Sequence, residues 1–391
     1  MAPAGLLRCH NWFMSVTTAE ARVDLGAISN NVDLLREQAG GAGVMAVVKA
    51  DGYGHGIVPA ARAAVAGGAS WLGVATLDEA MTVRRAGLDT PAMCWLYTPG
   101  ERFDDAIAAG VDLSATSVGQ VAEITQAAAR VGRQVRLHLK VDTGLSRSGA
   151  TPADWPSVVD AALRAQADGL ASVVGLWSHF ACADEPGHPS IAAQLRVFDE
   201  TIEVAEKAGV RPEVCHIANS AATLTLPEAR YDLVRPGIAV YGLDPIPSLG
   251  LTRRLGLRPA MTLAARVAVA KRVGAGEGVS YGHRYVTSAE TTLGLVPIGY
   301  ADGVPRHGTN LLQVWAAGKR RRIAGTVCMD QFVIDVGDDG IQAGDEVVLF
   351  GPGDGGEPTA QDWAEMLGTI SYEIVTRIGA RIPRTYGGDT Q

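Results

Sequence analysis

A lysine that directly follows an apolar run is the first feature of this sequence with chemical meaning. The run "VMAVV" at 44–48 predicts a buried strand, and Lys49 stands at its end, followed by "ADGYGHG". Partial burial at such a rim lowers the pKa of a lysine, and its neutral amine can form a Schiff base. The alternative is a strand-end lysine that reaches solvent. The glycines of the motif favour the first interpretation, because they leave room for a flat ligand beside the hydroxyl of Tyr53.

Polar residues follow several other apolar runs in the same way. They are Lys140 and Arg147 at and after the run 135–141, His179 in the run 173–180, Asn219 and Ser220 after 214–218, and Arg235 and Gly237 in "LVRPG". In a barrel of parallel strands these side chains would meet at one mouth, where such barrels hold their active sites. The sequence therefore predicts one active site built from many strand ends.

The elements that must position these residues are eight short β-rich runs separated by Ala-rich helical spacers. The runs lie at 44–48, 71–75, 92–97, 111–115, 135–141, 173–180, 214–218 and 237–242. Eight successive β-then-α units predict an α/β fold with an N-terminal TIM (β/α)8 barrel. A doubly wound open sheet is the rival, but it calls for a G-x-G-x-x-G turn where Lys49 stands.

The pattern changes after about residue 245. Segments such as "TTLGLVPIGYADG" and "RRIAGTVCMDQFVIDV" alternate with period two between glycine-rich turns, which predicts a C-terminal, mostly β domain. One late helix is expected, with Thr359 as its N-cap. The predicted organisation is a loose N-terminal tail at 1–18, a cofactor-binding barrel at 19–245 and a β domain at 246–391.

The composition of the chain argues against nucleic acid and membranes as binding partners. The net charge of -8 gives no electrostatic footprint for nucleic acid or an anionic membrane, and no apolar run approaches the roughly 20 residues of a membrane span. The five cysteines are scattered and form no C-x-x-C pair, so neither disulfides nor a metal site is expected. We expect a cytoplasmic enzyme that acts on a small molecule.

Several longer motifs carry a family resemblance. They are "AVVKADGYGHG", "KVDTGLSRSG", "HIANSAA", "DLVRPGIAVYG", "GVSYG", "PIGYADG" and "CMDQ". Together they resemble the alanine racemase family, from about residue 20 to 386 and over both domains. The resemblance implies a pyridoxal 5'-phosphate-dependent isomerase that interconverts L- and D-alanine, works as a homodimer with shared active sites, and supplies D-alanine for cell-wall peptidoglycan.

By this resemblance two bases flank the substrate. Lys49 binds the cofactor and is the base for the D-enantiomer, and Tyr281, from the partner subunit, is the base for the L-enantiomer. A tyrosine is a weak base at its ordinary pKa near 10, so His179 is expected to relay or stabilise its proton. Arg235 faces the pyridine nitrogen, where a permanent cation opposes protonation and weakens the cofactor as an electron sink. Without the resemblance, we would interpret Tyr281 and His179 as packing residues. Arg235 would be interpreted as one partner of a salt bridge.

The resemblance also assigns the remaining contacts. The further cofactor-binding residues are Tyr53, Arg147, Asn219, Ser220, Gly237, Ile238 and Tyr372. Arg147 also approaches the substrate carboxylate, and Lys140 is a possible carbamylated lysine that orients Arg147. A plain lysine paired with Asp142, or a chloride ion at this place, is the alternative.

On the substrate side the resemblance implies Met329 and Asp330 from the partner subunit, and an entry corridor lined by Asp184, Tyr300 and Arg306. One departure stands out. Many relatives have an arginine of this corridor where the chain has Thr326. The replacement bears on how the substrate carboxylate is guided inward.

Three other functions are compatible with parts of the sequence. A broader-specificity amino-acid racemase would share every motif. A non-catalytic pyridoxal phosphate homeostasis protein would resemble the barrel alone, whereas this chain continues with the domain that carries Tyr281. A decarboxylase with a related barrel and β domain would lack "GVSYG" and "CMDQ".

Overall fold

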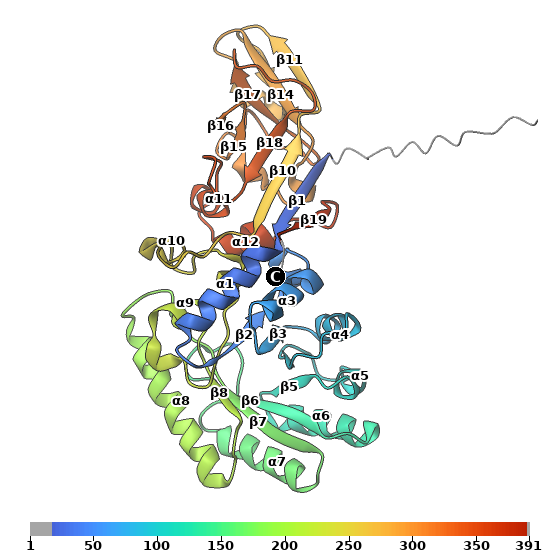
Figure 1. The fold of residues 1–391 in the computed structure, drawn as a ribbon, viewed down its shortest axis with the longest axis vertical. Helices are drawn as coiled ribbons and strands as arrows, with labels where there is room; N and C mark the ends of the chain where they lie inside the picture. Colours follow the sequence, from blue (N-terminus) through green and yellow to red (C-terminus); the bar gives the residue numbers. More distant parts are fainter. Residues whose placement is uncertain (1–17, 389–391) are drawn as a thin grey trace, which may run out of the picture.

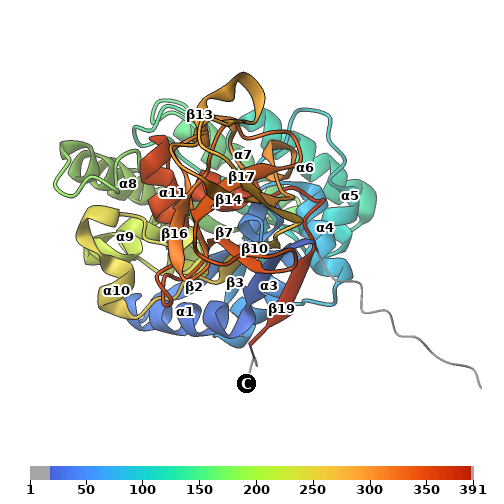
Figure 2. The same cartoon turned by 90° about the horizontal axis from the view of Figure 1, so that it is seen from above.

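The computed structural model describes residues 18–388, so the predicted tail lies outside the described residues apart from Thr18. Figure 1 shows an elongated molecule with a barrel domain at one end and a β-rich domain at the other. Figure 2, a view along the long axis, shows the helices of the barrel domain arranged around its strands. Within residues 18–388, no helix is both long and apolar enough to cross a membrane.

Eight parallel strands form the barrel sheet, in the order β8-β7-β6-β5-β4-β3-β2-β9. They are β2 (Gly43–Val47), β3 (Trp71–Val74), β4 (Ala92–Cys94), β5 (Asp112–Ala115), β6 (Val135–Lys140), β7 (Ala171–Trp177), β8 (Val214–His216) and β9 (Leu233–Val234). Single backbone bonds bridge the seam between β8 and β9, among them one from the N–H of Arg235 to the carbonyl of Ala218 at 2.9 Å. The predicted α/β barrel is confirmed.

The eighth strand is not the predicted one. Residues 237–242 were expected to be extended, but Ile238–Tyr241 form the 3-10 helix η2, and the strand is the two-residue β9 just before it. Gly237 leaves the extended region with ψ -84°, and Gly242 ends the turn at φ 74°. A short buried apolar run cannot be assigned to strand or helix from its composition alone, which explains the error.

Helices alternate with the barrel strands as predicted. They are α1 (Leu25–Gln38), α2 (Lys49–Tyr53), α3 (Ile57–Ala66), α4 (Leu77–Arg85), α5 (Asp104–Ala108), α6 (Val118–Val131), α7 (Trp155–Ala167), α8 (Pro189–Ala208) and α9 (Ser220–Thr225). Local capping sets several ends: Ser117 caps the start of α6 through the N–H of Gln120, and Gly132 ends it in the left-handed region. The short η1 (Pro227–Ala229), η3 (Pro247–Leu249) and α10 (Leu251–Leu255) complete the domain.

The second domain is mostly β, as predicted. Its strands are β1 (Ala19–Asp24), β10 (Met261–Arg266), β11 (Val269–Val273), β12 (Gly278–Val279), β13 (Tyr285–Val286), β14 (Thr291–Val296), β15 (Gln313–Ala316), β16 (Lys319–Arg322), β17 (Phe332–Gly337), β18 (Glu346–Phe350) and β19 (Arg384–Gly387). They form a six-stranded sheet (β16-β15-β18-β10-β1-β19), a three-stranded sheet (β11-β14-β17) and the β12-β13 hairpin. Three one-turn helices, η4 (Tyr281–His283), η5 (Tyr300–Asp302) and η6 (Arg306–Gly308), each carry a predicted site residue.

The first described strand belongs to this second domain, although the barrel was predicted to begin at residue 19. β1 pairs with β10 and β19, and Asp24 then caps α1, which leads into the barrel. The chain thus crosses between the domains at both ends of the barrel. Thr359 caps α11 (Ala360–Leu367) as predicted, and α12 (Ser371–Thr376) follows it.

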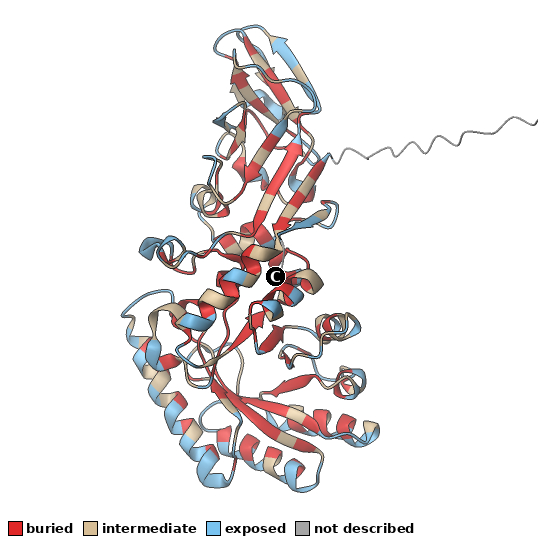
Figure 3. Cartoon of the chain, viewed as in Figure 1, coloured by how far each residue is buried: buried red, intermediate tan, exposed pale blue. Residues whose placement is uncertain are grey.

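Side chains fill the inside of the barrel. One layer consists of the apolar residues Met45, Trp71, Met93, Trp177 and Leu233, which are all at least nine-tenths buried. Figure 3 shows the strands of the barrel domain mostly buried and the outer faces of its helices exposed. Because side chains alternate along a strand, every second residue points into this interior, and the residues next above the layer reach the mouth.

Candidate active site

A cavity of about 610 Å³ lies at the carboxyl ends of the barrel strands. Its lining includes all the predicted cofactor-binding residues, together with His179 and Lys140. These residues are Lys49, Tyr53, Lys140, Arg147, His179, Asn219, Ser220, Arg235, Gly237, Ile238 and Tyr372. Trp95 and Trp177 form further walls that the sequence analysis missed. Each stands two residues beyond an inward-facing position, so the period of two along strands could have found them.

The chain makes a left-handed turn directly after Lys49. The residues with positive φ are Ala50 (53°), Asp51 (52°), Gly52 (62°) and Tyr53 (53°). L-residues rarely adopt this conformation in succession, so the turn needs support. Glu79 accepts the N–H of Ala50 at 2.7 Å, and Asp51 accepts the N–H of Ile57 at 2.9 Å. These carboxylates hold the turn that keeps Lys49 at the mouth.

The glycines behind Lys49 do not have the predicted role. A Cβ on Gly54 would lie 2.4 Å from the carbonyl oxygen of Val375, and one on Gly56 would lie 2.2 Å from the hydroxyl of Tyr386. Both neighbours belong to the last elements of the chain, and neither glycine lines the cavity. The prediction that they clear space for a ligand is therefore wrong. They allow α12 and β19 to pack closely against the turn.

The amine of Lys49 has a lowered pKa. Burial is the main cause, and the positive charge of Arg147 adds to it, while Glu79 acts in the opposite direction. The Nζ atom lies 5.9 Å from the centre of the Trp95 ring. A lowered pKa leaves a larger fraction of the Lys49 amine neutral, which is the form that can act as a nucleophile or accept a proton.

Arg235 lies at the floor of the cavity, 5% exposed. Its Nη2 atom donates to the carbonyls of Ser178 at 2.7 Å and Ile217 at 3.2 Å, and the guanidinium lies 4.9 Å from the centre of the Trp177 ring. Burial lowers the pKa of Arg235 to about 9, so the group remains a cation at neutral pH. The site thus contains a permanent positive charge held by backbone carbonyls.

His179 contacts the same guanidinium. Arg235 Nη2 lies 3.1 Å from His179 Nδ1, and because an arginine can only donate, the imidazole nitrogen must accept. Burial and the surrounding cations hold the pKa of His179 well below its ordinary value. The ring is therefore neutral with its proton on Nε2, which can donate a hydrogen bond.

Beneath Arg235 the barrel interior holds buried polar residues that are not among the predicted site residues. His216 Nε2 lies 3.0 Å from His138 Nδ1, and His138 Nε2 lies 3.3 Å from a carboxylate oxygen of Asp112. All three are at most 1% exposed. A signal existed in β6: Arg136, His138 and Lys140 alternate in "VRLHLK" and so share the inward face.

Hydroxyl groups collect on another side of the cavity. Ser220, the first residue of α9, accepts the N–H of Gly237 at 2.8 Å, so two of the predicted cofactor-binding residues contact each other in the described chain. A Cβ at Gly237 would lie 2.2 Å from the hydroxyl of Tyr53, so a larger residue at position 237 would displace the Tyr53 ring. Burial raises the pKa of Tyr53 and of Tyr372, so both remain protonated donors.

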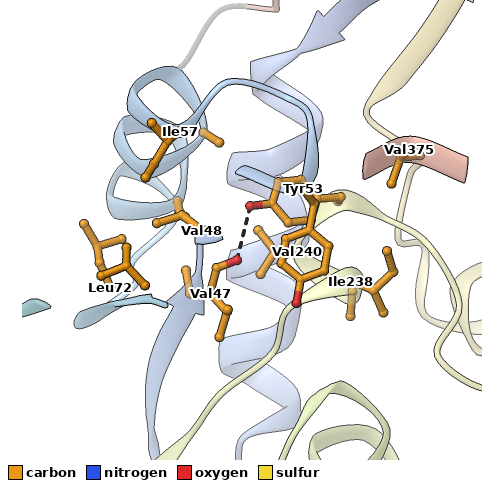
Figure 4. Close-up of a cluster of buried hydrophobic side chains, with 14 of the residues drawn as sticks. Val47, Val48, Tyr53, Ile57, Leu72, Ile238, Val240 and Val375 are labelled. Carbon is orange, nitrogen blue, oxygen red and sulfur yellow. Dashed lines mark hydrogen bonds between the residues drawn. The ribbon is translucent and has the colours of Figure 1, made fainter. Parts of the chain in front are cut away.

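Tyr53 is fixed by the apolar residues around it. Figure 4 shows it among Val47, Ile238 and Val240. The dashed bond in that view is donated by the hydroxyl of Tyr241 to the carbonyl of Val47, at 3.2 Å. The rings of Tyr53 and Tyr241 stack with centres 4.9 Å apart. This packing aims the hydroxyl of Tyr53 at the cavity.

Lys140 is buried without the predicted alternative partner. Asp142 instead accepts the N–H groups of Gly144 and Leu145, both at 2.9 Å, and no ion pair of residues 18–388 joins it to Lys140. The Nζ atom of Lys140 lies 4.4 Å from the centre of the Trp177 ring. Burial, followed by the charges of Arg235 and Arg147, lowers its pKa to about 7.

The cavity therefore collects positive charge without carboxylate partners. Lys49, Lys140, Arg147 and Arg235 all line it, and none of them takes part in an ion pair within the described chain. Burial is the main cause of the lowered pKa of both lysines, and the neighbouring positive charges lower it further, because cations this close together disfavour one another. The arrangement fits a ligand that brings several negative charges.

Apart from Tyr372 of α12, which lines the cavity, the predicted residues of the second domain lie elsewhere. Tyr281, Met329 and Tyr300 are 75%, 53% and 41% exposed, and none of them lines the cavity of the described chain. Asp330 pairs with Arg381 at 2.7 Å, while Asp184 and Arg306 are exposed and lie outside the cavity as well. One chain thus brings together the barrel residues and leaves Tyr281 facing outward.

Comparisons with known proteins cover both domains. Residues 23–245 match the family model described as alanine racemase, N-terminal domain, and residues 260–386 match alanine racemase, C-terminal domain. The alanine racemase of Thermobifida fusca (strain YX) is 61% identical over 370 residues, which are 95% of this chain and 98% of that protein. The corresponding protein of Frankia casuarinae is 60% identical over 366 residues, 94% and 95% of the two chains.

Solved structures agree with these matches. The alanine racemase from a D-cycloserine producing Streptomyces lavendulae superposes with a TM-score of 0.94 at 56% identity, over 95% of this chain and 98% of that one. The alanine racemase from Streptomyces coelicolor A3(2) gives 0.93 at 58% identity, with the same coverage. The match of the second domain argues against the homeostasis protein and the decarboxylase.

Proposed function

We propose that this chain, which belongs to the alanine racemase family, interconverts L- and D-alanine at the barrel mouth with pyridoxal 5'-phosphate as cofactor. The observation that carries the proposal is the cavity itself. It joins Lys49, whose pKa is lowered, to three further basic side chains that form no ion pair with a carboxylate within residues 18–388. A phosphate, a phenolic oxygen and an amino-acid carboxylate are the negative groups that such a site calls for.

The donor set fits this cofactor. The Lys49 amine would attach to its carbonyl carbon, and Arg235 would face its ring nitrogen as a fixed cation. Arg147 is assigned to the phenolic oxygen, and Asn219 is a further cofactor-binding residue. The residues assigned to the phosphate end are Tyr53, Ser220, Gly237, Ile238 and Tyr372. When bound, the cofactor supplies delocalisation of the electron pair left behind as the α-proton departs.

Two bases then carry the proton to and from the α-carbon. Lys49 takes or returns it on one face, and Tyr281 of the partner subunit does so on the other. His179 supports this arrangement, because the Nε2 proton inferred above can be donated to a phenolate oxygen and stabilise it. A homodimer is therefore part of the proposal, since Tyr281 does not line the cavity of its own chain.

Lys140 is assigned as a carbamylated lysine. Its pKa of about 7 leaves much of the amine neutral, which is the form that adds to carbon dioxide with loss of a proton. The carbamate would place a negative charge among Arg147, Arg235 and Lys49, where the described chain has none in contact. Growth in ¹³C-bicarbonate followed by NMR tests this assignment, and Lys140→Met should lack the carbamate signal.

The substrate carboxylate is assigned to Arg147 and to Met329 and Asp330 of the partner subunit. Asp184, Tyr300 and Arg306 are assigned to the entry. All of the second-domain residues in this set are exposed in the single chain, as an interface that closes over the cavity requires. We further propose that the D-alanine serves peptidoglycan synthesis.

Two variants separate the roles of the bases. Lys49→Ala should lose both the visible absorption of the attached cofactor and the conversion of L- to D-alanine. Tyr281→Phe should keep the absorption and lower kcat by about 10²- to 10⁴-fold, as expected for loss of a general base. Full activity in either variant would contradict the proposal.

A further inference from the structure

The backbone that carries Tyr281 is strained. Ser280, directly before it, has φ 61° and ψ -171°, a region that is essentially limited to glycine. Gly282 and His283, directly after it, have φ 72° and 44°. Such a turn persists only when its surroundings determine it, and Tyr281 itself is 75% exposed, so its side chain offers little support within one chain.

Two reciprocal hydrogen bonds join this turn to the segment around Thr326. The hydroxyl of Thr326 donates to the carbonyl of Tyr281 at 2.7 Å, and the hydroxyl of Ser280 donates to the carbonyl of Thr326 at 2.7 Å. Thr326 is 3% exposed. A Cβ on Gly325, whose φ is 84°, would lie 2.5 Å from the carbonyl oxygen of Val279, so the two backbones are in direct contact.

The Thr326 segment is in turn anchored to the domain. The N–H of Gly325 donates to Asn310 Oδ1 at 2.6 Å, and the N–H of Val327 donates to Thr309 Oγ1 at 3.2 Å. Ala324, just before it, donates to the carbonyl of Val333 in β17 at 2.8 Å. Thr326 therefore ties the turn that holds Tyr281 to the rest of the domain. Two further contacts support it: Asn310 Nδ2 donates to the carbonyl of Arg284 at 2.8 Å, and Ser280 Oγ lies 3.3 Å from Cys328 Sγ.

We propose that Thr326 is a positioning residue for Tyr281, and that its hydroxyl, together with that of Ser280, fixes the turn from which Tyr281 reaches the partner's substrate. The inference rests on the proposed function for the role of Tyr281 as a base. It gives Thr326, which stands where many relatives have an arginine of the entry corridor, a structural role of its own. Thr326 does not face an entry in this chain; it is buried against the backbone of the second base.

This role of Thr326 can be tested with substitutions that remove its hydroxyl group without changing the size of its side chain. Thr326→Val keeps the volume and removes the donor, whereas Thr326→Ser keeps the donor. Ser280→Ala removes the reciprocal bond and should resemble Thr326→Val. Thr125→Val is the matched control, because it removes a buried hydroxyl that bonds the carbonyl of Val121 in α6, far along the chain from this turn.

The first readout is amide hydrogen exchange of the dimeric protein, which needs no activity. The N–H of His283 donates to the carbonyl of Ser280 at 3.2 Å and reports on the closed turn. Its exchange should become severalfold faster in Thr326→Val and Ser280→Ala, and should remain unchanged in Thr326→Ser and Thr125→Val. Unchanged exchange in Thr326→Val would overturn the proposal.

The second readout is the fate of the α-proton of D-alanine in deuterium oxide. Lys49 alone can exchange this proton with retention, whereas inversion also needs Tyr281. Thr326→Val should lower inversion severalfold relative to retention, because a displaced base transfers its proton poorly. A parallel fall of both rates would show a merely structural role. If the unmodified protein exchanges no α-proton at all, the proposed function fails, and amide exchange alone decides the role of Thr326.

Discussion

Arg235 Nη1 lies 2.9 Å from His216 Nδ1, and this contact sets the direction of the hydrogen bonds that lead from His216 through His138 to Asp112. Because arginine only donates, His216 must accept at Nδ1 and carry its proton on Nε2. That proton points at His138 Nδ1, so His138 carries its own proton on Nε2, toward Asp112. A cation at the mouth and a carboxylate deep in the barrel thus fix both neutral tautomers between them.

This chain of bonds predicts a strong effect of Gly175→Ala in the middle of β7. A Cβ at Gly175 would lie 2.0 Å from His138 Nδ1, so the imidazole would have to leave its place between His216 and Asp112. We expect a loss of roughly 1–3 kcal/mol in the free energy of unfolding, as for other overpacked cores. Urea unfolding of the two proteins measures it.

The matched control is Gly119→Ala on the exposed first turn of α6, where the nearest atom to the new Cβ is Ser117 Oγ at 3.8 Å. This change should stabilise the protein slightly, because alanine favours a helix more than glycine does. Equal stabilities of Gly175→Ala and the unmodified protein would show that the interior tolerates a displaced His138.

The interior chain also marks the limit of what could be predicted from the sequence. Polar residues at or next to the ends of apolar runs indicate chemistry in a barrel, and this pattern identifies Lys49, Lys140 and Arg235. Asp112 and His138 lie within runs, where a polar residue signals function only if its inward direction is recognised. The left-handed turn after Lys49 could not be predicted either, because Glu79, which supports it, belongs to α4, 29 residues beyond Ala50 in the chain.

The second domain shows a different limit. Its β character is predictable from period-two patterns. The place of β1 is not, because this one strand precedes the barrel in sequence whereas the other five strands of its sheet all follow residue 260. The sequence shows that Thr326 departs from the family pattern. Its contact with Tyr281 could not be predicted, because the two residues lie 45 positions apart in sequence and no local pattern indicates that their turns meet.

Lys140 predicts a pH dependence of stability in the cofactor-free protein. Its pKa is about 7 when folded, against an ordinary value of 10.5. Between these values the unfolded chain binds a proton at Lys140 that the folded chain does not, so stability rises with pH across this window. Lys140→Met should flatten the rise between pH 7 and about 9, measured by urea unfolding in buffers free of carbon dioxide.

An exposed lysine provides the control for this slope. Lys271→Met, in β11 of the second domain, should leave the slope of the unmodified protein in place. If Lys140→Met and Lys271→Met give the same slope, then Lys140 does not lose its proton on folding, and its neutral amine cannot be invoked for a carbamate.

Mixed dimers test whether active sites are shared. Lys49→Ala and Tyr281→Phe should each be nearly inactive alone. A dimer with one chain of each kind contains one site with both changes and one site with neither. Subunits exchanged at equal concentrations should therefore regain roughly a quarter of the unmodified activity, since half of the dimers are mixed. No recovery, with mixed dimers shown to form, would mean that Lys49 and Tyr281 do not act in one site across the interface.

The most direct measurement of the central claim follows the α-carbon of the substrate. The protein, with pyridoxal 5'-phosphate bound, is incubated with pure L-alanine in deuterium oxide; NMR follows loss of the α-proton, and chiral chromatography follows D-alanine. We expect α-deuterated D-alanine to appear and the two enantiomers to approach equal amounts. Neither exchange nor D-alanine, with the cofactor shown to be bound, would contradict the account.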